Sequence, residues 1–119
     1  MNKKIGIIGF GNIGSAIYGQ LISRFPTQLY VCDHHIDKIN ALKPEYISLN
    51  YNDIIPIVDV IILAIKPQSF LNWQKDTLDM QNKLIISVMA GVTIDSVRKT
   101  TGCHKVARAM PNLGVQIGQ

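Results

Sequence analysis

The feature that most constrains the fold of this chain is a turn with three glycines, GFGNIG at residues 9–14. It follows Lys4–Ile8, a β-branched run that predicts a strand, and it opens Asn12–Arg24, where apolar residues recur at helical spacing. Glycine loses more conformational entropy on folding than any other residue, so this turn indicates a backbone that needs the missing side chains. A strand, the pattern G-x-G-x-x-G and a helix in this order are typical of a dinucleotide-binding unit.

Strand-sized apolar runs alternate with helix-like segments through the rest of the chain. This alternation predicts a Rossmann-type, doubly wound α/β fold, with a mostly parallel sheet and helices on both faces. No internal linker interrupts the pattern, so residues 1–119 are predicted to form one NAD(P)-binding domain. Further strands are expected at Leu29–Cys32, Tyr46–Leu49, Val60–Ile65, Leu84–Met89 and Lys105–Ala109, and further helices at Ile36–Leu42, Asn52–Val58, Pro67–Met80 and Thr93–Thr100.

Composition and charge disfavour several other classes of protein. The chain is 47% hydrophobic and 17% charged, which argues against disorder, and it has no apolar run of membrane-spanning length. The net charge of +4 comes from scattered basic residues without interleaved aromatic ones, so no nucleic-acid partner is expected. Cys32 and Cys103 form no motif and fit free thiols in a reducing cytoplasm.

The three glycines have different expected roles in binding a dinucleotide. Gly9 permits the tight turn, Gly11 lets the backbone approach a pyrophosphate, and Gly14 lets the helix pack closely on the sheet. Backbone N–H groups at the start of the helix, around Asn12 and Ile13, would then face the phosphates, whose charge the helix dipole favours. The alternative is a glycine-rich turn that serves packing alone.

Asp33 ends the second expected strand, 24 residues after Gly9. A carboxylate at this place can accept hydrogen bonds from both hydroxyls of the adenosine ribose and would repel the 2′-phosphate of NADP, which favours NAD. Asp33 could instead cap a helix or a turn. The neighbouring His34, also a candidate cofactor-binding residue, could contact a phosphate together with His35 and Lys38.

The sequence CDHH at residues 32–35 also raises the question of a metal site. Zinc ligands are usually separated by two to four residues, and no second ligand group lies nearby in the sequence. Exposed loop histidines are the simpler interpretation, and no metal is predicted.

Four segments together resemble the N-terminal half of pyrroline-5-carboxylate reductase. They are IGIIGFGNIGSAI at 5–17, LAIKPQ at 63–68, ISVMAGVTI at 86–94 and RAMPN at 108–112, and the resemblance covers essentially the whole chain. It implies a cofactor-binding domain of an enzyme that transfers hydride from NAD(P)H to 1-pyrroline-5-carboxylate, giving proline. The cofactor carries that chemistry, and no catalytic side chain is assigned.

The resemblance also implies roles for residues at the carboxyl ends of the expected strands. Lys66 has an alternative as an exposed charge, Gly91 as a turn glycine, and the local match at Asn52 is loose. The implied cofactor-binding residues are Asn52, Ala64, Lys66, Pro67, Ala90 and Gly91, and the implied substrate-adjacent residues are Val92, Met110, Pro111 and Asn112.

The chain also departs from the family pattern. Asp33 stands where the family commonly has a small polar residue, consistent with NADP use, so NADP is favoured by the resemblance and NAD by this carboxylate. MPNLGV replaces the family's usual MPNTP at residues 110–115. The helical second domain, which makes the dimer and much of the imine site, is missing, so a longer, homo-oligomeric native protein is expected.

Two other functions remain open at this point. One is a related NAD(P)-dependent reductase of small substrates, such as a β-hydroxyacid dehydrogenase or a deazaflavin-dependent NADP reductase. The other is a non-catalytic NAD(P)-binding regulatory module. The paired segments MAGVTI and MPN favour the pyrroline-5-carboxylate reductase interpretation over the related reductases.

Overall fold

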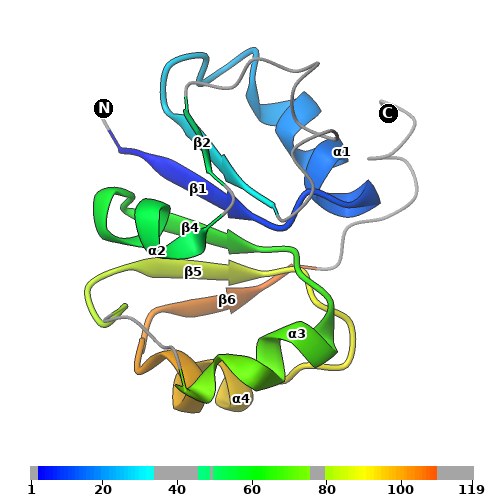
Figure 1. The fold of residues 1–119 in the computed structure, drawn as a ribbon, viewed down its shortest axis with the longest axis vertical. Coiled ribbons are helices and arrows are strands. Elements are labelled where there is room, and N and C mark those ends of the chain that lie inside the picture. Colours follow the sequence, from blue (N-terminus) through cyan, green and yellow to red (C-terminus); the bar gives the residue numbers. More distant parts are fainter. Residues whose placement is uncertain (1–2, 34–45, 49, 76–79, 110–119) are drawn as a thin grey trace.

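A computed structural model describes residues 3–33, 46–48, 50–75 and 80–109 of the chain. In this part, six parallel strands form one sheet in the order β3-β2-β1-β4-β5-β6, and their arrows in Figure 1 point to the same edge. The predicted doubly wound sheet is therefore confirmed, with every described strand pair parallel. The strands are β1 (Ile5–Ile8), β2 (Leu29–Cys32), β3 (Tyr46–Ser48), β4 (Val60–Leu63), β5 (Leu84–Ser87) and β6 (Val106–Arg108).

The described helices lie on both faces of this sheet. The residues of α1 pack with one group of buried side chains, and those of the other helices pack with a second group on the opposite face. Figure 1 shows α1 near β2 and shows α3 and α4 beside β5 and β6. The helical segments are α1 (Asn12–Leu21), α2 (Tyr51–Ile54) with the 3-10 turn η2 (Ile55–Ile57), α3 (Pro67–Leu71) with η3 (Asn72–Lys75), and α4 (Ile94–Thr101).

Successive residues of the central strands belong to opposite cores. Ile7 packs in the core under α1, whereas Ile8 packs in the core that α2, α3 and α4 cover. In β4, Ile62 belongs to the first core, while Ile61 and Leu63 belong to the second. Because side chains alternate between the faces of a strand, a strand buried on both faces reads as a continuous apolar run.

Several elements are shorter than the sequence pattern predicts. The strand expected at Val60–Ile65 ends at Leu63, and the one expected at Leu84–Met89 ends at Ser87. Their apolar extensions continue into loops at the carboxyl edge, where Ala64 and Val88 still donate backbone hydrogen bonds to Ile8 and Leu63. Periodicity cannot separate these loop residues from the strands because both are apolar.

The helices also differ from the predicted bounds. The first ends at Leu21 rather than Arg24, and the one expected from Pro67 to Met80 gives way to a 3-10 segment after Leu71. The helix expected at Asn52–Val58 begins one residue earlier and becomes 3-10 at Ile55, next to Pro56. The helix expected at Ile36–Leu42 lies outside the described residues.

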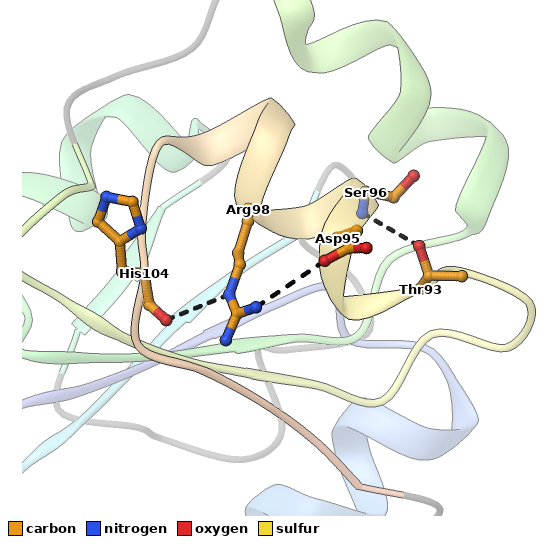
Figure 2. A network of polar contacts seen from close by, with 5 residues as sticks. All are labelled: Thr93, Asp95, Ser96, Arg98 and His104. Atoms are coloured by element: carbon orange, nitrogen blue, oxygen red, sulfur yellow. Dashed lines mark hydrogen bonds and ion pairs between the residues drawn. The ribbon is translucent and has the colours of Figure 1, made fainter.

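Local polar contacts fix both ends of α4 (Figure 2). Thr93 Oγ1 accepts the N–H of Ser96 at 3.1 Å, so Thr93 is the N-cap of a helix that the sequence predicts to begin at this residue. Gly102 ends the helix in the left-handed conformation at φ 74°. Arg98 then links the helix to the following segment, because its Nε donates to the carbonyl of His104 at 3.3 Å.

None of the helices in the described residues is both long enough and apolar enough to cross a bilayer.

Candidate functional site

The glycine turn lies where β1, the centre of the sheet, meets α1. Gly9 has φ +98°, and a Cβ at this residue would lie 2.6 Å from the carbonyl oxygen of Ala64. A Cβ at Gly14 would overlap the carbonyl oxygen of Gly9. Nothing among the described residues lies within 4 Å of a Cβ built at Gly11. Packing therefore explains Gly9 and Gly14 but leaves Gly11 without a packing reason.

The N-terminus of α1 is open to an anion. The first N–H groups of a helix have no acceptor within the helix, and Gly11 at the N-cap has no side chain to supply one. Within the described ranges no side chain caps this end, and its first turn contains no acidic residue. Asn12 is exposed and Ile13 half-buried, so these amides are available to a phosphate, as the helix dipole favours.

Asp33 contacts the glycine turn directly. Its Oδ2 accepts the backbone N–H of Phe10 at 2.6 Å, and the N–H of Gly9 donates to the carbonyl of Cys32 at 2.8 Å. The Phe10 ring is 2% exposed and meets Tyr18 of α1 edge-on, with 5.7 Å between the ring centroids. No sequence pattern indicates the bond to Phe10, which joins residues 23 positions apart.

A cleft of about 290 Å³ opens beside the turn at the carboxyl edge of the sheet. It brings together residues from the glycine turn, the loop after β4 and the loop after β5, which are the segments singled out from the sequence. Lys66, which is exposed, is the one charged side chain among the described lining residues. The cleft is lined by Gly11, Asn12, Ile13, Ala64, Ile65, Lys66, Pro67, Val88, Met89 and Ala90.

A smaller cavity of about 60 Å³ lies next to Asp33. The ring of Tyr51 stacks on that of Trp73 at its wall, with 4.5 Å between the centroids. Ile65 lines both this cavity and the larger cleft, and so lies between them. The cavity is lined by Ile8, Gly9, Cys32, Asp33, Tyr51, Ile65, Ser69 and Trp73.

Cys32 is the cysteine of this smaller cavity. Burial raises the pKa of its thiol from 9.0 to about 12, with the negative charges of Asp33 and Asp53 acting in the same direction. The side chain is 3% exposed, so this cysteine is a neutral, buried thiol at ordinary pH.

Three residues that line the larger cleft were not predicted as site residues, namely Ile65, Val88 and Met89. Each follows an apolar strand inside a segment already singled out, LAIKPQ or ISVMAGVTI. Their apolar character suggested strand interior rather than cleft wall. The position just past a strand end in a parallel sheet is the signal that would have identified them.

Other predicted residues lie elsewhere. Asn52 is exposed on α2 and donates its backbone N–H to Asn50 Oδ1 at 2.9 Å, while its neighbour Tyr51 lines the smaller cavity. Gly91 has φ +72° in the loop that precedes α4, and Val92 is 6% exposed within the core that α4 covers. His34, Met110, Pro111 and Asn112 lie outside the described residues, and no group of three metal-ligating side chains occurs among those described.

A parallel sheet in this order, with a glycine turn at the point where the strand order reverses, defines a Rossmann-type nucleotide-binding domain. The chain belongs to the family described as "NADP oxidoreductase coenzyme F420-dependent", whose model matches residues 4–91.

Individual relatives agree with the resemblance found in the sequence. The chain is 36% identical to the pyrroline-5-carboxylate reductase of Escherichia coli K12 over 121 residues, covering 94% of this chain and 45% of the relative. The solved pyrroline-5-carboxylate reductase of Streptococcus pyogenes is 33% identical with a TM-score of 0.81, and that of Coxiella burnetii is 25% identical with a TM-score of 0.83. Each of the two matches covers 98% of this chain. They cover 45% of the Streptococcus pyogenes chain and 47% of the Coxiella burnetii chain.

The predicted resemblance to pyrroline-5-carboxylate reductases is therefore confirmed. The chain spans less than half the length of these relatives.

Proposed function

We propose that this chain binds NAD(P)H and forms the dinucleotide half of a pyrroline-5-carboxylate reductase. The observation that carries the proposal is the cleft at the carboxyl edge, where the uncapped start of α1 meets the loops after β4 and β5. Ligands of open α/β sheets bind in this position, and the relatives in which the same fold recurs are named as reductases of this imine.

Different residues of the cleft bind different parts of the dinucleotide in this proposal. The amides around Gly11, Asn12 and Ile13 hold the diphosphate, and the open space at Gly11 lets it approach the backbone. The apolar wall formed by Val88 and Met89 excludes water beside the nicotinamide end. When bound, the reduced nicotinamide supplies the hydride that converts the C=N bond of the imine to an amine.

We further propose that Asp33 makes the chain prefer NAD(H) to NADP(H). The family's description names NADP, but this carboxylate lies beside the turn, on the side where the adenosine ribose is expected. A negative charge facing a 2′-phosphate weakens binding by roughly five- to a hundredfold. Dissociation constants for NADH and NADPH at one salt concentration test this, and tighter binding of NADPH would overturn it.

The imine site is proposed to need residues beyond these 119. Hydride transfer requires the acceptor carbon to be held about 3–3.5 Å from the donor, in an aligned pose. The cleft supplies one wall, and the reductase relatives are more than twice as long as the chain. We propose that the missing part of the site comes from a second domain, through which the full-length protein forms a homo-oligomer.

The test combines binding with turnover. The 119-residue chain is titrated with NADH by calorimetry, and NADH absorbance is then followed with 1-pyrroline-5-carboxylate, with the Escherichia coli relative as the positive control. We expect NADH binding and turnover at least a hundredfold below the control. Failure to bind either dinucleotide would overturn the proposed function, and turnover equal to the control would overturn the need for a second domain.

A second candidate function follows from the family's description, which names a coenzyme F420-dependent NADP oxidoreductase. The match to the family model covers residues 4–91 and stops before the MPN segment at 110–112, which favours the imine reductase. An assay of a full-length version of the protein with coenzyme F420 in place of the imine discriminates between the two candidate functions. Hydride exchange with F420 and none with the imine would favour the second candidate.

We place the proposed enzyme in the cytoplasm. Cys32 and Cys103 are both buried and free, which fits a reducing compartment. Fractionation of cells that express a tagged chain tests this placement, and recovery with the membrane or a secreted fraction would contradict it.

A further inference from the structure

Two hydrogen bonds tie the glycine turn to the end of β2. The backbone bond from Gly9 to Cys32 continues the pairing of the strands by one residue. The bond from the Phe10 amide to Asp33 Oδ2 at 2.6 Å is different, because a side chain reaches back to the turn. Hydrogen bonds to an ionised acceptor are short and strong, and Asp33 is half-buried.

The position of Phe10 makes this bond relevant to the cleft. Phe10 immediately precedes Gly11, whose amide and open backbone face the diphosphate in the proposed complex. The Phe10 ring is buried against Tyr18 of α1, which fixes its side chain, and Asp33 fixes the backbone amide of the same residue through the hydrogen bond. The residues on either side, Gly9 and Gly11, are glycines, whose backbone is the least restricted of all residue types, so the turn depends on such contacts for its shape.

We propose that Asp33 is a positioning residue for the diphosphate site, which holds the Phe10 amide and thereby orients the amides at the start of α1. This role acts through the turn, and is separate from any contact of the same carboxylate with the adenosine ribose. It rests on the proposed function only in naming a diphosphate as the ligand.

The chain contains a matched control for this bond. Asp59 Oδ2 accepts the backbone N–H of Lys4 at 2.9 Å, which is the same kind of bond at the start of β1 and β4. That site lies at the amino edge of the sheet, opposite the cleft. Loss of the Asp59 bond reports what such a contact contributes to stability without touching the glycine turn.

The experiment compares alanine with asparagine at each aspartate. Both substitutions remove the charge, but asparagine keeps an oxygen acceptor, so the comparison isolates the hydrogen bond. The probes are inorganic pyrophosphate, which contains no ribose, and NADH, with calorimetry and nitrogen-edited NMR of the backbone amides as the measurements. The Phe10 amide proton is expected far downfield in the wild type and shifted upfield in Asp33→Ala.

We expect Asp33→Ala to bind pyrophosphate about tenfold more weakly than Asp33→Asn, the effect of losing one hydrogen bond that orients the site. The same ratio should hold for NADH, and Asp59→Ala and Asp59→Asn should bind both probes equally. A role in ribose recognition alone predicts equal pyrophosphate binding by the two Asp33 variants, which would overturn the proposal.

The test also separates this proposal from the proposed function. If the wild type binds pyrophosphate but neither dinucleotide, the proposed function fails while the comparison of Asp33 variants still decides the positioning role. If the Phe10 amide signal is unchanged in Asp33→Ala, or the wild type binds no pyrophosphate, the positioning role itself is overturned.

Discussion

The amino edge of the sheet and the start of α1 at its carboxyl edge differ in how their backbone polar groups are satisfied. At the amino edge, side chains form hydrogen bonds with backbone groups. Asp59 Oδ2 accepts the N–H of Lys4, and the ammonium of Lys83 donates to the carbonyl of Val58 at 2.7 Å. At the carboxyl edge, the start of α1 has no side-chain cap from any described residue. Backbone N–H groups at a helix end cost stability unless water or a ligand accepts their hydrogen bonds. The start of α1, at the carboxyl edge, is therefore suited to binding a ligand.

Glycine follows the same division. Gly102, which ends α4 before β6 begins, serves to terminate a helix, with φ 74°. The glycines of the carboxyl edge include Gly11, which has no positive φ and on which an added Cβ would meet no described residue within 4 Å beyond its chain neighbours. A residue with no folding reason to be glycine, at the mouth of a cleft, is better explained by what it leaves room for. The pairs of variants below test this difference between the edges.

The largest effect is expected within the glycine turn itself. Gly14→Val forces a side chain into the carbonyl of Gly9 and should cost about 3 kcal/mol or more of unfolding free energy. Gly11→Val should keep its helix content but lose most of its dinucleotide affinity, because the new side chain occupies the open space. Circular dichroism with calorimetric titration measures both. Normal affinity in a folded Gly11→Val would remove this residue from the binding site.

Two lysines provide the next comparison. Lys83→Met removes the hydrogen bond to Val58 at the amino edge and should cost about 1 kcal/mol of stability, with no change in NADH affinity. Lys66→Met removes the charge that lines the cleft and should weaken NADH binding several-fold, with stability unchanged because Lys66 is exposed. Denaturant unfolding and titrations at two salt concentrations check this. Equal effects of both variants on affinity would contradict the division between edges.

A smaller effect is expected at two glycines with similar positive φ. Gly91 has φ +72° at the carboxyl edge and Gly102 has φ +74°, and a Cβ at either would meet no close obstacle. Alanine at each should therefore cost a similar ~1 kcal/mol, from backbone conformation alone. Only Gly91→Ala should also change NADH affinity, since Gly91 adjoins Ala90 in the cleft. If both leave affinity unchanged, Gly91 is a turn glycine only.

The last comparison concerns the pH dependence of stability at Cys32, which shows only above about pH 9. The folded state keeps the thiol proton up to a pKa of about 12, whereas the unfolded chain loses it near 9.0. The stabilisation from this group is therefore fully present below pH 9 and declines as the pH rises from about 9 toward 12. Cys32→Ala should show a shallower decline in that window than the wild type in urea titrations. Parallel curves would show that the thiol ionises equally in both states.

The class of fold was predictable from the sequence because its signals are local. The alternation of apolar runs with helical spacing needs no knowledge of distant residues, and runs buried on both faces identify strands of a parallel sheet. The glycine spacing at residues 9–14 placed a turn between the first strand and helix, and the helix expected at Thr93–Thr100 occurs one residue further on, at Ile94–Thr101. These features depend on residues within a few positions of one another.

Tertiary structure decided which of these residues meet. The bond between Phe10 and Asp33 joins the ends of two separate strands. No sequence pattern in either segment predicts that β1 pairs with β2 and so brings these residues together. Ile65 and Met89 line a cleft rather than extend their strands, because pairing stops at Leu63 and Ser87. Apolar residues give the same sequence pattern inside a strand and in the loop just after it. Only the pairing of strands in the folded sheet decides at which residue the strand ends and the loop begins.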